Sequence, residues 1–501
     1  MSWMLTYDWS LMFNLECILW ICFGTLVGLL IGALPGLGPT VGIALMLPLS
    51  ATLEPIPAIA MLVALYMSGE YGGAITAVVL GIPGTAAAVP TCFDGYPMAK
   101  SGKPGKAVAY SLTASTIGGI FGVMVLAFLT VPLSRWCINF SDPEFFLIAS
   151  FGLLSVSGMS SANGSKTMVS ILAGLLLGTI GLDTFTGVPR FCKGIPVLYD
   201  GFDLVSVLIG MFAITEVLNM VLGNLSGHKP PESKDLKVQL SLSEIIHILP
   251  TTIKSSLIGI VCGIIPGLGG GVAAMMSYSE TKRSSKHPET FGNGEPLGIA
   301  ASESANNAVV GGALIPFLTL GIPGSSTIAI VSGALMMQGI QPGITLMKDR
   351  PELVYSIFVA LFIAVIAMYV IGRFTNGIWA RVLILPNSIL APIVLLLAVL
   401  GAYASRGNVF DVWVALAAGV VWWFLNKVGF SRGAFVLAYI LATLFESGFR
   451  RSLQISHGSY GIFISRPICV IFLILIVILI GGRKVIEGVK QRKAAKTESE
   501  G

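Results

Sequence analysis

The residues best suited to chemistry lie in two copies of one tetrapeptide, GIPG at 81–84 and GIPG at 321–324, each followed by hydroxyl side chains. Gly and Pro interrupt helical hydrogen bonding, and an interrupted helix exposes backbone N–H groups and a positive dipole end, which attract anions. We expect each proline to occupy the first position of the next helix. The candidate anion-binding residues are Gly81, Pro83, Gly84, Thr85, Gly321, Pro323, Gly324, Ser325, Ser326 and Thr327.

A second pair of breaks is predicted at PGLG, which occurs at 35–38 and 266–269. These helix-break residues are Pro35, Gly36, Gly38, Pro266, Gly267 and Gly269. For both motifs an alternative stays open, because small residues also permit close packing between membrane helices. The hydroxyls after GIPG also have an alternative role, which is to bond back to their own helix.

Polar side chains in apolar surroundings are the next candidates. Asn306 and Asn307 are adjacent and need partners if buried; they suit substrate binding, Na⁺ ligation or a tie between helices. Glu70 and Glu303 lie near the breaks, and an acid at bilayer depth is a candidate for proton or Na⁺ coupling. Either acid can instead cap a helix at the interface. Asp94 is read as a turn residue in CFDGYP, with a ligand role as the alternative.

The composition predicts the elements that hold these residues. Of 501 residues, 54% are hydrophobic and 11% are charged, against about 25% charged in a typical soluble domain. We therefore expect an all-α polytopic membrane protein with about 12 or more transmembrane segments, several interrupted by Gly and Pro or folded as re-entrant hairpins. The stretch 167–186 is one predicted span.

The distribution of charge predicts orientation. No Lys or Arg precedes Lys100, whereas the end of the chain is basic, which places a tail at 483–501 in the cytoplasm and the N-terminus outside. A net charge of +5 gives no indication of nucleic-acid binding. The seven Cys and four His show no metal-ligand spacing, so no metal is expected apart from a coupling Na⁺.

The motifs recur in one order, which indicates an internal repeat. From Pro35 to Gly81 is 46 positions (81 − 35), and from Pro266 to Gly321 is 55 (321 − 266), with a polar insert in the second copy. We predict a first repeat half at 1–223, a polar linker at 224–250 and a second half at 251–482. Duplicated halves with broken helices are typical of secondary transporters.

These motifs resemble those of the large membrane subunit of the tripartite tricarboxylate transporter family. The resemblance rests on PGLG, on the segment 71–107 and on the segment 278–325, and it extends from about residue 15 to about residue 480. Ser302 stands where family members often have Pro before the Glu of this segment.

The resemblance implies ion-gradient-driven uptake of a carboxylate, such as citrate, across a bacterial inner membrane. The implied partners are a small four-helix membrane subunit and a periplasmic solute-binding protein, with Na⁺ or H⁺ as the coupling ion and no cofactor. No GxxxxGK[ST] loop for ATP is present. An intramembrane enzyme would need a buried nucleophile and base, and no His lies in an apolar span. A channel-like or purely structural membrane subunit stays open as an alternative.

Overall fold

A computed structural model describes residues 3–34, 37–137, 140–159, 164–183, 185–192, 194–222, 239–382 and 387–479. These residues are predominantly helical, and the strands among them form one short hairpin. The polytopic all-α prediction is therefore confirmed in its general form. Pro35 and Gly36, most of the predicted linker and the predicted tail lie outside the described residues.

The chain divides into two compact units. Unit 1 comprises residues 1–137 and 202–427, and unit 2 comprises 138–201 and 428–501. The helices of unit 1 are α1 (Trp3–Thr6), η1 (Trp9–Leu11), α2 (Leu15–Ala33), α3 (Gly38–Ala51), α4 (Pro55–Leu80), η2 (Ala86–Ala88), α5 (Val89–Lys100), α6 (Pro104–Cys137), α9 (Leu204–Ile209), η4 (Gly210–Ile214), α10 (Thr215–Leu222), α11 (Leu242–Ile264), α12 (Gly269–Ser284), η5 (Pro288–Thr290), α13 (Pro296–Leu320), α14 (Ser326–Met337), α15 (Ile344–Asp349), α16 (Pro351–Val382), α17 (Asn387–Arg406) and α18 (Val409–Lys427).

Nine helices in the described part of the chain are long and apolar enough to cross a membrane. They are Leu15–Ala33, Pro55–Leu80, Pro104–Cys137, Leu204–Leu222, Leu242–Ile264, Pro351–Thr375, Ser388–Arg406, Val409–Lys427 and Arg432–Ile455. Shorter apolar helices, among them α3 and α14, accompany them. The expected total of about 12 or more segments stays a prediction.

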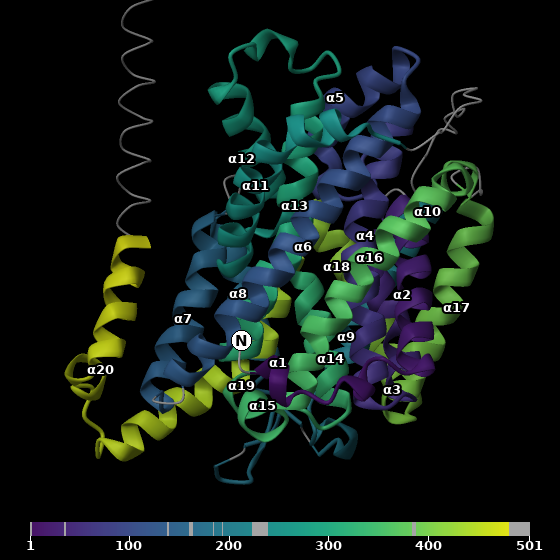
Figure 1. Cartoon of the computed structure of the whole chain (residues 1–501). Helices are drawn as coiled ribbons and strands as arrows, with labels where there is room; N and C mark the ends of the chain where they lie inside the picture. The colour runs from purple at the N-terminus through teal and green to yellow at the C-terminus, as the bar shows by residue number, and fades with distance from the viewer. Residues whose placement is uncertain are drawn as a thin grey trace, which may run out of the picture. The chain divides into compact units, whose positions relative to one another are not determined.

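Two helix pairs organise unit 1. α2 packs along α4, and α11 packs along α13, as Figure 1 shows. The two helices of each pair approach closely because glycines of one helix face backbone carbonyl groups of the other. A Cβ on Gly32 would collide with the Gly69 oxygen, and a Cβ on Gly263 would lie 2.7 Å from the Val309 oxygen. Gly32 and Gly263 each lie three residues before PGLG, so equivalent sequence positions make equivalent contacts.

α4 and α13 are the most enclosed helices of unit 1. Almost every residue of α4 from Pro57 to Val79, and of α13 from Gly298 to Thr319, is buried. Neither helix has a strongly one-sided apolar pattern, because both are rich in small and apolar residues on all faces. The same helices lead directly into the two GIPG motifs.

Unit 2 contains α7 (Asp142–Met159), α8 (Gly164–Leu177), α19 (Arg432–Ile455), α20 (Ile462–Ser465) and the helix Pro467–Leu479. Between α8 and the end of its first segment lie β1 (Gly181–Leu182), β2 (Pro189–Arg190) and η3 (Pro196–Leu198). β1 and β2 are antiparallel, with Gly181 opposite Arg190. The prediction of a span at 167–186 is therefore wrong, because α8 ends at Leu177 and a glycine-containing hairpin follows.

Candidate functional site

Both GIPG motifs interrupt the helices as predicted. α4 ends at Leu80 and α13 at Leu320, and the glycine that follows each helix is left-handed, with φ of 69° at Gly81 and 75° at Gly321. Glycine adopts this conformation without the steric cost that a Cβ imposes. The prolines lie inside the non-helical segments, so the prediction that each takes the first helical position is wrong.

The last glycine of each motif fits into a narrow space. A Cβ on Gly84 would collide with the Gly32 oxygen and lie 2.7 Å from the Gly73 Cα. A Cβ on Gly324 would lie 2.6 Å from the Gly263 oxygen and 2.7 Å from the Ala313 Cα. Each break is thus packed against backbone of its own helix pair, at corresponding positions.

The PGLG motifs end in helix starts. Gly38 opens α3 with φ of 62°, and Gly269 opens α12 with φ of 64°. Gly267 is also left-handed, its N–H donates to the Gly324 oxygen at 3.3 Å, and Pro266 is buried. The second PGLG motif therefore contacts the second GIPG motif directly.

Segments from the two predicted halves cross at the breaks. The Thr40 hydroxyl in α3 lies 2.7 Å from the Thr327 hydroxyl in α14, and the Tyr66 hydroxyl in α4 lies 3.1 Å from Ser325 Oγ. The second half also contacts the first break, because the start of α12 packs against η2. A Cβ on Gly270 of α12 would lie 3.1 Å from the Ala87 Cβ of η2. The N-terminal ends of α3, η2, α12 and α14 therefore gather around both breaks.

The predicted hydroxyls differ in what they already bind. Ser325 caps α14, because its Oγ accepts from the Ile328 N–H at 3.2 Å. Thr327 pairs with Thr40, and Ser326 is partly exposed. The Thr85 hydroxyl is buried and has no hydrogen-bond partner among the described residues. Among these side chains, Thr85 is the one whose hydroxyl is both buried and without a partner among the described residues.

Asn306 and Asn307 are completely buried in α13. Their Nδ2 groups donate to α4, Asn306 to the Glu70 oxygen at 3.4 Å and Asn307 to the Met67 oxygen at 3.0 Å. The tie between helices is thus present. The Oδ1 atoms of both residues have no partner among the described residues. The Oδ1 atom of Asn306 lies against Gly270 at the start of α12, where an added Cβ would collide with it. Two free amide oxygens are acceptors, which suit a cation or an O–H donor.

Glu303 is fully buried one turn before Asn306. It accepts hydrogen bonds from the Thr91 hydroxyl of α5 and, at 2.8 Å, from the Ser115 hydroxyl of α6. No cation pairs with it among the described residues. Glu70 lies in α4, is partly exposed, and its backbone oxygen receives the Asn306 amide. Glu303 therefore contacts α5 and α6 from α13, and Glu70 lies in α4 beside Asn306 of α13.

Asp94 is a correction to the sequence reading. It is buried in α5, where its Oδ1 accepts from the N–H groups of Gly292, Gly294 and Glu295 at 2.8, 3.0 and 2.8 Å. Its Oδ2 accepts from the Tyr278 hydroxyl at 2.9 Å. The DGYP letters resemble a turn, but the backbone continues as a helix to Lys100.

Sequence reasoning missed Thr40, Tyr66, Thr91 and Ser115, which contact the candidate residues from other helices. Thr40 lies two residues after PGLG, and its position next to a predicted helix start was an available signal. Tyr66 and Ser115 lie inside long apolar helices, where a single hydroxyl carries no spacing information, and Thr91 lies near the start of the short helix α5.

Interrupted helices buried inside a multi-span helical unit define a membrane transport protein. Residues 18–437 match the tripartite tricarboxylate transporter TctA family, and the chain belongs to this family. The family is one of transporters, which agrees with a protein that is not an enzyme.

Two relatives come from Agrobacterium vitis. An uncharacterized 52.8 kDa protein in the TAR-I ttuC' 3'region is 34% identical over 451 residues, which cover 90% of each chain. An uncharacterized protein in the TAR-II ttuC' 3'region is 35% identical over 210 residues, 42% of this chain and 87% of that protein. No solved structure matches the chain significantly.

Proposed function

We propose that the protein is the permease subunit of a three-component system that takes up a carboxylate across the bacterial inner membrane, driven by an ion gradient. The observation that carries the proposal is the gathering of the N-terminal ends of α3, α12 and α14, together with η2, from both predicted halves at the two GIPG breaks. Helix N-termini stabilise negative charge through free N–H groups and the helix dipole, each by about 0.3–1 kcal/mol and by more when desolvated.

The substrate carboxylates bind, on this proposal, between the segments 81–85 and 321–327. Thr85 supplies a free hydroxyl, and the Thr40–Thr327 pair supplies two more that can exchange their mutual bond for bonds to substrate. A site built from backbone dipoles and hydroxyls, without an arginine clamp, holds an anion and still releases it. A tricarboxylate such as citrate is the proposed substrate, in keeping with the family description.

Coupling is proposed to use α13. The free Oδ1 atoms of Asn306 and Asn307 are of the type that ligates Na⁺, and Glu303 is a buried acid able to bind a proton. Because α13 runs directly into the break at Gly321, an ion bound on this helix can bias the position of the substrate site. Movement of one half against the other would then alternate access to the site.

The correspondence between the halves supports the proposed duplication at 1–223 and 251–482. Gly32, Gly73 and Gly84 in the first half make the contacts that Gly263, Ala313 and Gly324 make in the second. The partners in this proposal are a small membrane subunit and a periplasmic binding protein, with the tail at 483–501 in the cytoplasm.

Reconstitution tests the proposal. The full chain is placed in proteoliposomes with the proposed small membrane subunit, and uptake of labelled citrate is measured with the proposed solute-binding protein present. We expect saturable uptake that needs an inward Na⁺ or proton gradient and the binding protein. Non-saturating flux would instead favour the channel-like alternative, and no flux with any di- or tricarboxylate would reject the proposed function.

A further inference from the structure

The hairpin that follows α8 in unit 2 exposes large apolar side chains on irregular backbone. Val188, Phe191 and Ile195 are 57%, 66% and 47% exposed. Irregular backbone does not face lipid within the hydrocarbon region, because its polar groups would go unsatisfied. These side chains therefore lie outside the membrane core, where contiguous exposed apolar groups mark interaction sites.

The backbone at the hairpin is held in a costly conformation. Phe191 has φ of 58°, a left-handed value that is rare for a residue with a large side chain. The buried Cys192 packs beneath this backbone, and its single S–H lies within reach of the Arg190 and Leu198 oxygens, with Sγ–O distances of 3.2 and 3.3 Å. Such strain persists only where the surroundings hold it, and it keeps the Phe191 ring presented outward.

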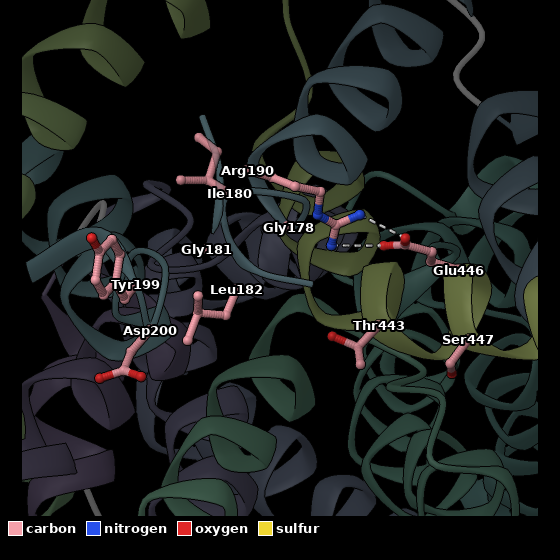
Figure 2. Close-up of a pocket in the computed structure, with 10 residues that line it drawn as sticks. All are labelled: Gly178, Ile180, Gly181, Leu182, Arg190, Tyr199, Asp200, Thr443, Glu446 and Ser447. Carbon is pink, nitrogen blue, oxygen red and sulfur yellow. Dashed lines mark hydrogen bonds and ion pairs between the residues drawn. The ribbon is translucent and has the colours of Figure 1, made fainter. Parts of the chain in front are cut away.

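A polar cavity of about 270 Å³ lies beside the hairpin, wholly within unit 2 (Figure 2). Arg190 and Glu446 form one wall through a bidentate pair with distances of 2.7 and 3.2 Å. Asp200 lies on the opposite side, is exposed, and forms no ion pair with the residues that the structure describes. One cation and two carboxylates among the lining residues leave the cavity with one net negative charge.

An ion-pair network holds the side chains at the wall of this cavity in place. Arg450 donates to Asp183 Oδ2 at 2.7 Å and to Glu446 Oε1 at 2.9 Å, and it stacks on Phe185. The hydrogen bond from Arg450 holds the pKa of Asp183 well below its usual range. The hairpin is therefore anchored to α19 by charged groups on both of its strands.

The helices of unit 2 indicate which side of the membrane this hairpin faces. α8 runs beside α19, with Gly178 against Ala442, so the hairpin lies near Glu446. α7 starts at that same end, where Phe146 contacts Phe449. The helix Pro467–Leu479 also starts there, beside Glu144, and leads away toward the basic tail. On the expectation that this helix crosses the membrane and that the tail is cytoplasmic, the hairpin faces the outside of the cell.

We propose that the described hairpin residues 181–183, 185–192 and 194–195, together with the adjacent cavity, form the docking surface for the water-soluble solute-binding subunit, which inserts a Lys or Arg side chain beside Asp200. This rests on the proposed function. A soluble partner is favoured over the small membrane subunit because the surface lies on irregular backbone outside the helices. Phe191 provides the apolar anchor, and Asp200 provides charge complementarity.

The test measures binding of the purified solute-binding protein of the proposed system to the full chain in lipid nanodiscs. Phe191→Ser is expected to raise Kd by about tenfold or more. Tyr460→Ser is the matched control, since Tyr460 is also 66% exposed in unit 2 but lies off the hairpin, and it should leave Kd within about twofold. Asp200→Asn is expected to slow association at low salt and to flatten its salt dependence.

An unchanged Kd in Phe191→Ser, an equal loss in Tyr460→Ser, or no binding by the wild type would overturn the docking surface. Unchanged salt dependence in Asp200→Asn would reject the cavity as the cation site. Citrate uptake by the same preparations separates the two proposals. Normal uptake with normal binding in Phe191→Ser refutes docking alone, whereas binding without uptake by the wild type refutes the proposed function alone.

Discussion

The hydroxyls of Thr40 and Thr327 lie 2.7 Å apart, although 287 positions separate the two residues. One belongs to the first turn of α3 and the other to the first turn of α14, so the bond joins helix starts from the two predicted halves. A net contribution of about 0.5–1.5 kcal/mol is typical of such a bond, which is small enough to be exchanged during a transport cycle. Contacts of this strength suit a site that must both close and open.

Gly84 and Gly324 are expected to tolerate no side chain. In Gly84→Ala the new Cβ meets the Gly32 oxygen, and in Gly324→Ala it meets the Gly263 oxygen, so backbone must shift in each case. We expect each variant to lower citrate uptake in proteoliposomes by about tenfold or more, because displacement of a break by an ångström costs about a hundredfold in comparable sites.

Gly333→Ala is the control for these variants. Gly333 lies in α14, near the second break, but the atom nearest to the Cβ that alanine would add is 3.5 Å away, an ordinary contact. It should insert and transport like the wild type. Normal uptake by both Gly84→Ala and Gly324→Ala, at wild-type levels in the membrane, would show that the breaks do not form the site.

Thr85→Val is expected to weaken substrate binding without lowering the stability of the protein. The Thr85 hydroxyl is buried without a partner among the described residues, and an unsatisfied buried polar group costs about 1–3 kcal/mol. Valine removes that group at nearly constant volume, so the melting temperature in detergent should stay equal or rise while the KM for citrate rises about fivefold or more. Thr252→Val, whose hydroxyl bonds its own helix at Leu249, should leave KM unchanged. A fall in stability without a change in KM would contradict this role.

Glu303→Gln tests coupling. The substitution keeps the size of the side chain but removes the ionisable group; the amide oxygen can still accept from one of the Thr91 and Ser115 hydroxyls, while the other hydroxyl must turn to accept from the amide NH2. We expect the stimulation of uptake by an imposed ion gradient to fall about tenfold, with the KM for citrate within about twofold of the wild type. Ser302→Ala, a neighbour that bonds only to its own helix, is the control. Unchanged stimulation by both Na⁺ and proton gradients would exclude Glu303 as a coupling group.

The sequence predicted the breaks well, because Gly and Pro act locally. The rule that Gly ends a helix in the left-handed conformation holds at Gly81 and Gly321. It also singled out Asn306 and Asn307, because adjacent amides stand out in an apolar segment, and both side chains are buried. The repeated order of motifs anticipated the matching contacts of Gly32 and Gly263.

Contacts between distant segments could not be predicted in the same way. Hydropathy extended a span through 167–186, whereas Gly178 and Gly181 end the helix and begin a hairpin. Asp94 looked like a turn residue because its neighbours Gly95 and Pro97 favour turns. Its partners lie about 200 positions away in the second half, and tertiary hydrogen bonds override the local preference for a turn.

Asp94 is expected to hold the polar insert of the second half, and its loss should loosen that segment. Asp94→Ala strips the acceptor from the N–H groups of Gly292, Gly294 and Glu295, which should destabilise the region by about 3 kcal/mol or more. Tryptic cleavage after Lys286 reports this locally, and its rate should rise about tenfold or more because cleavage follows local opening. Asp94→Asn, which keeps one acceptor oxygen, should give an intermediate rate. Asp8→Asn, at an exposed cap, is the control, and equal cleavage in Asp94→Ala and the wild type would show that the insert is held by other contacts.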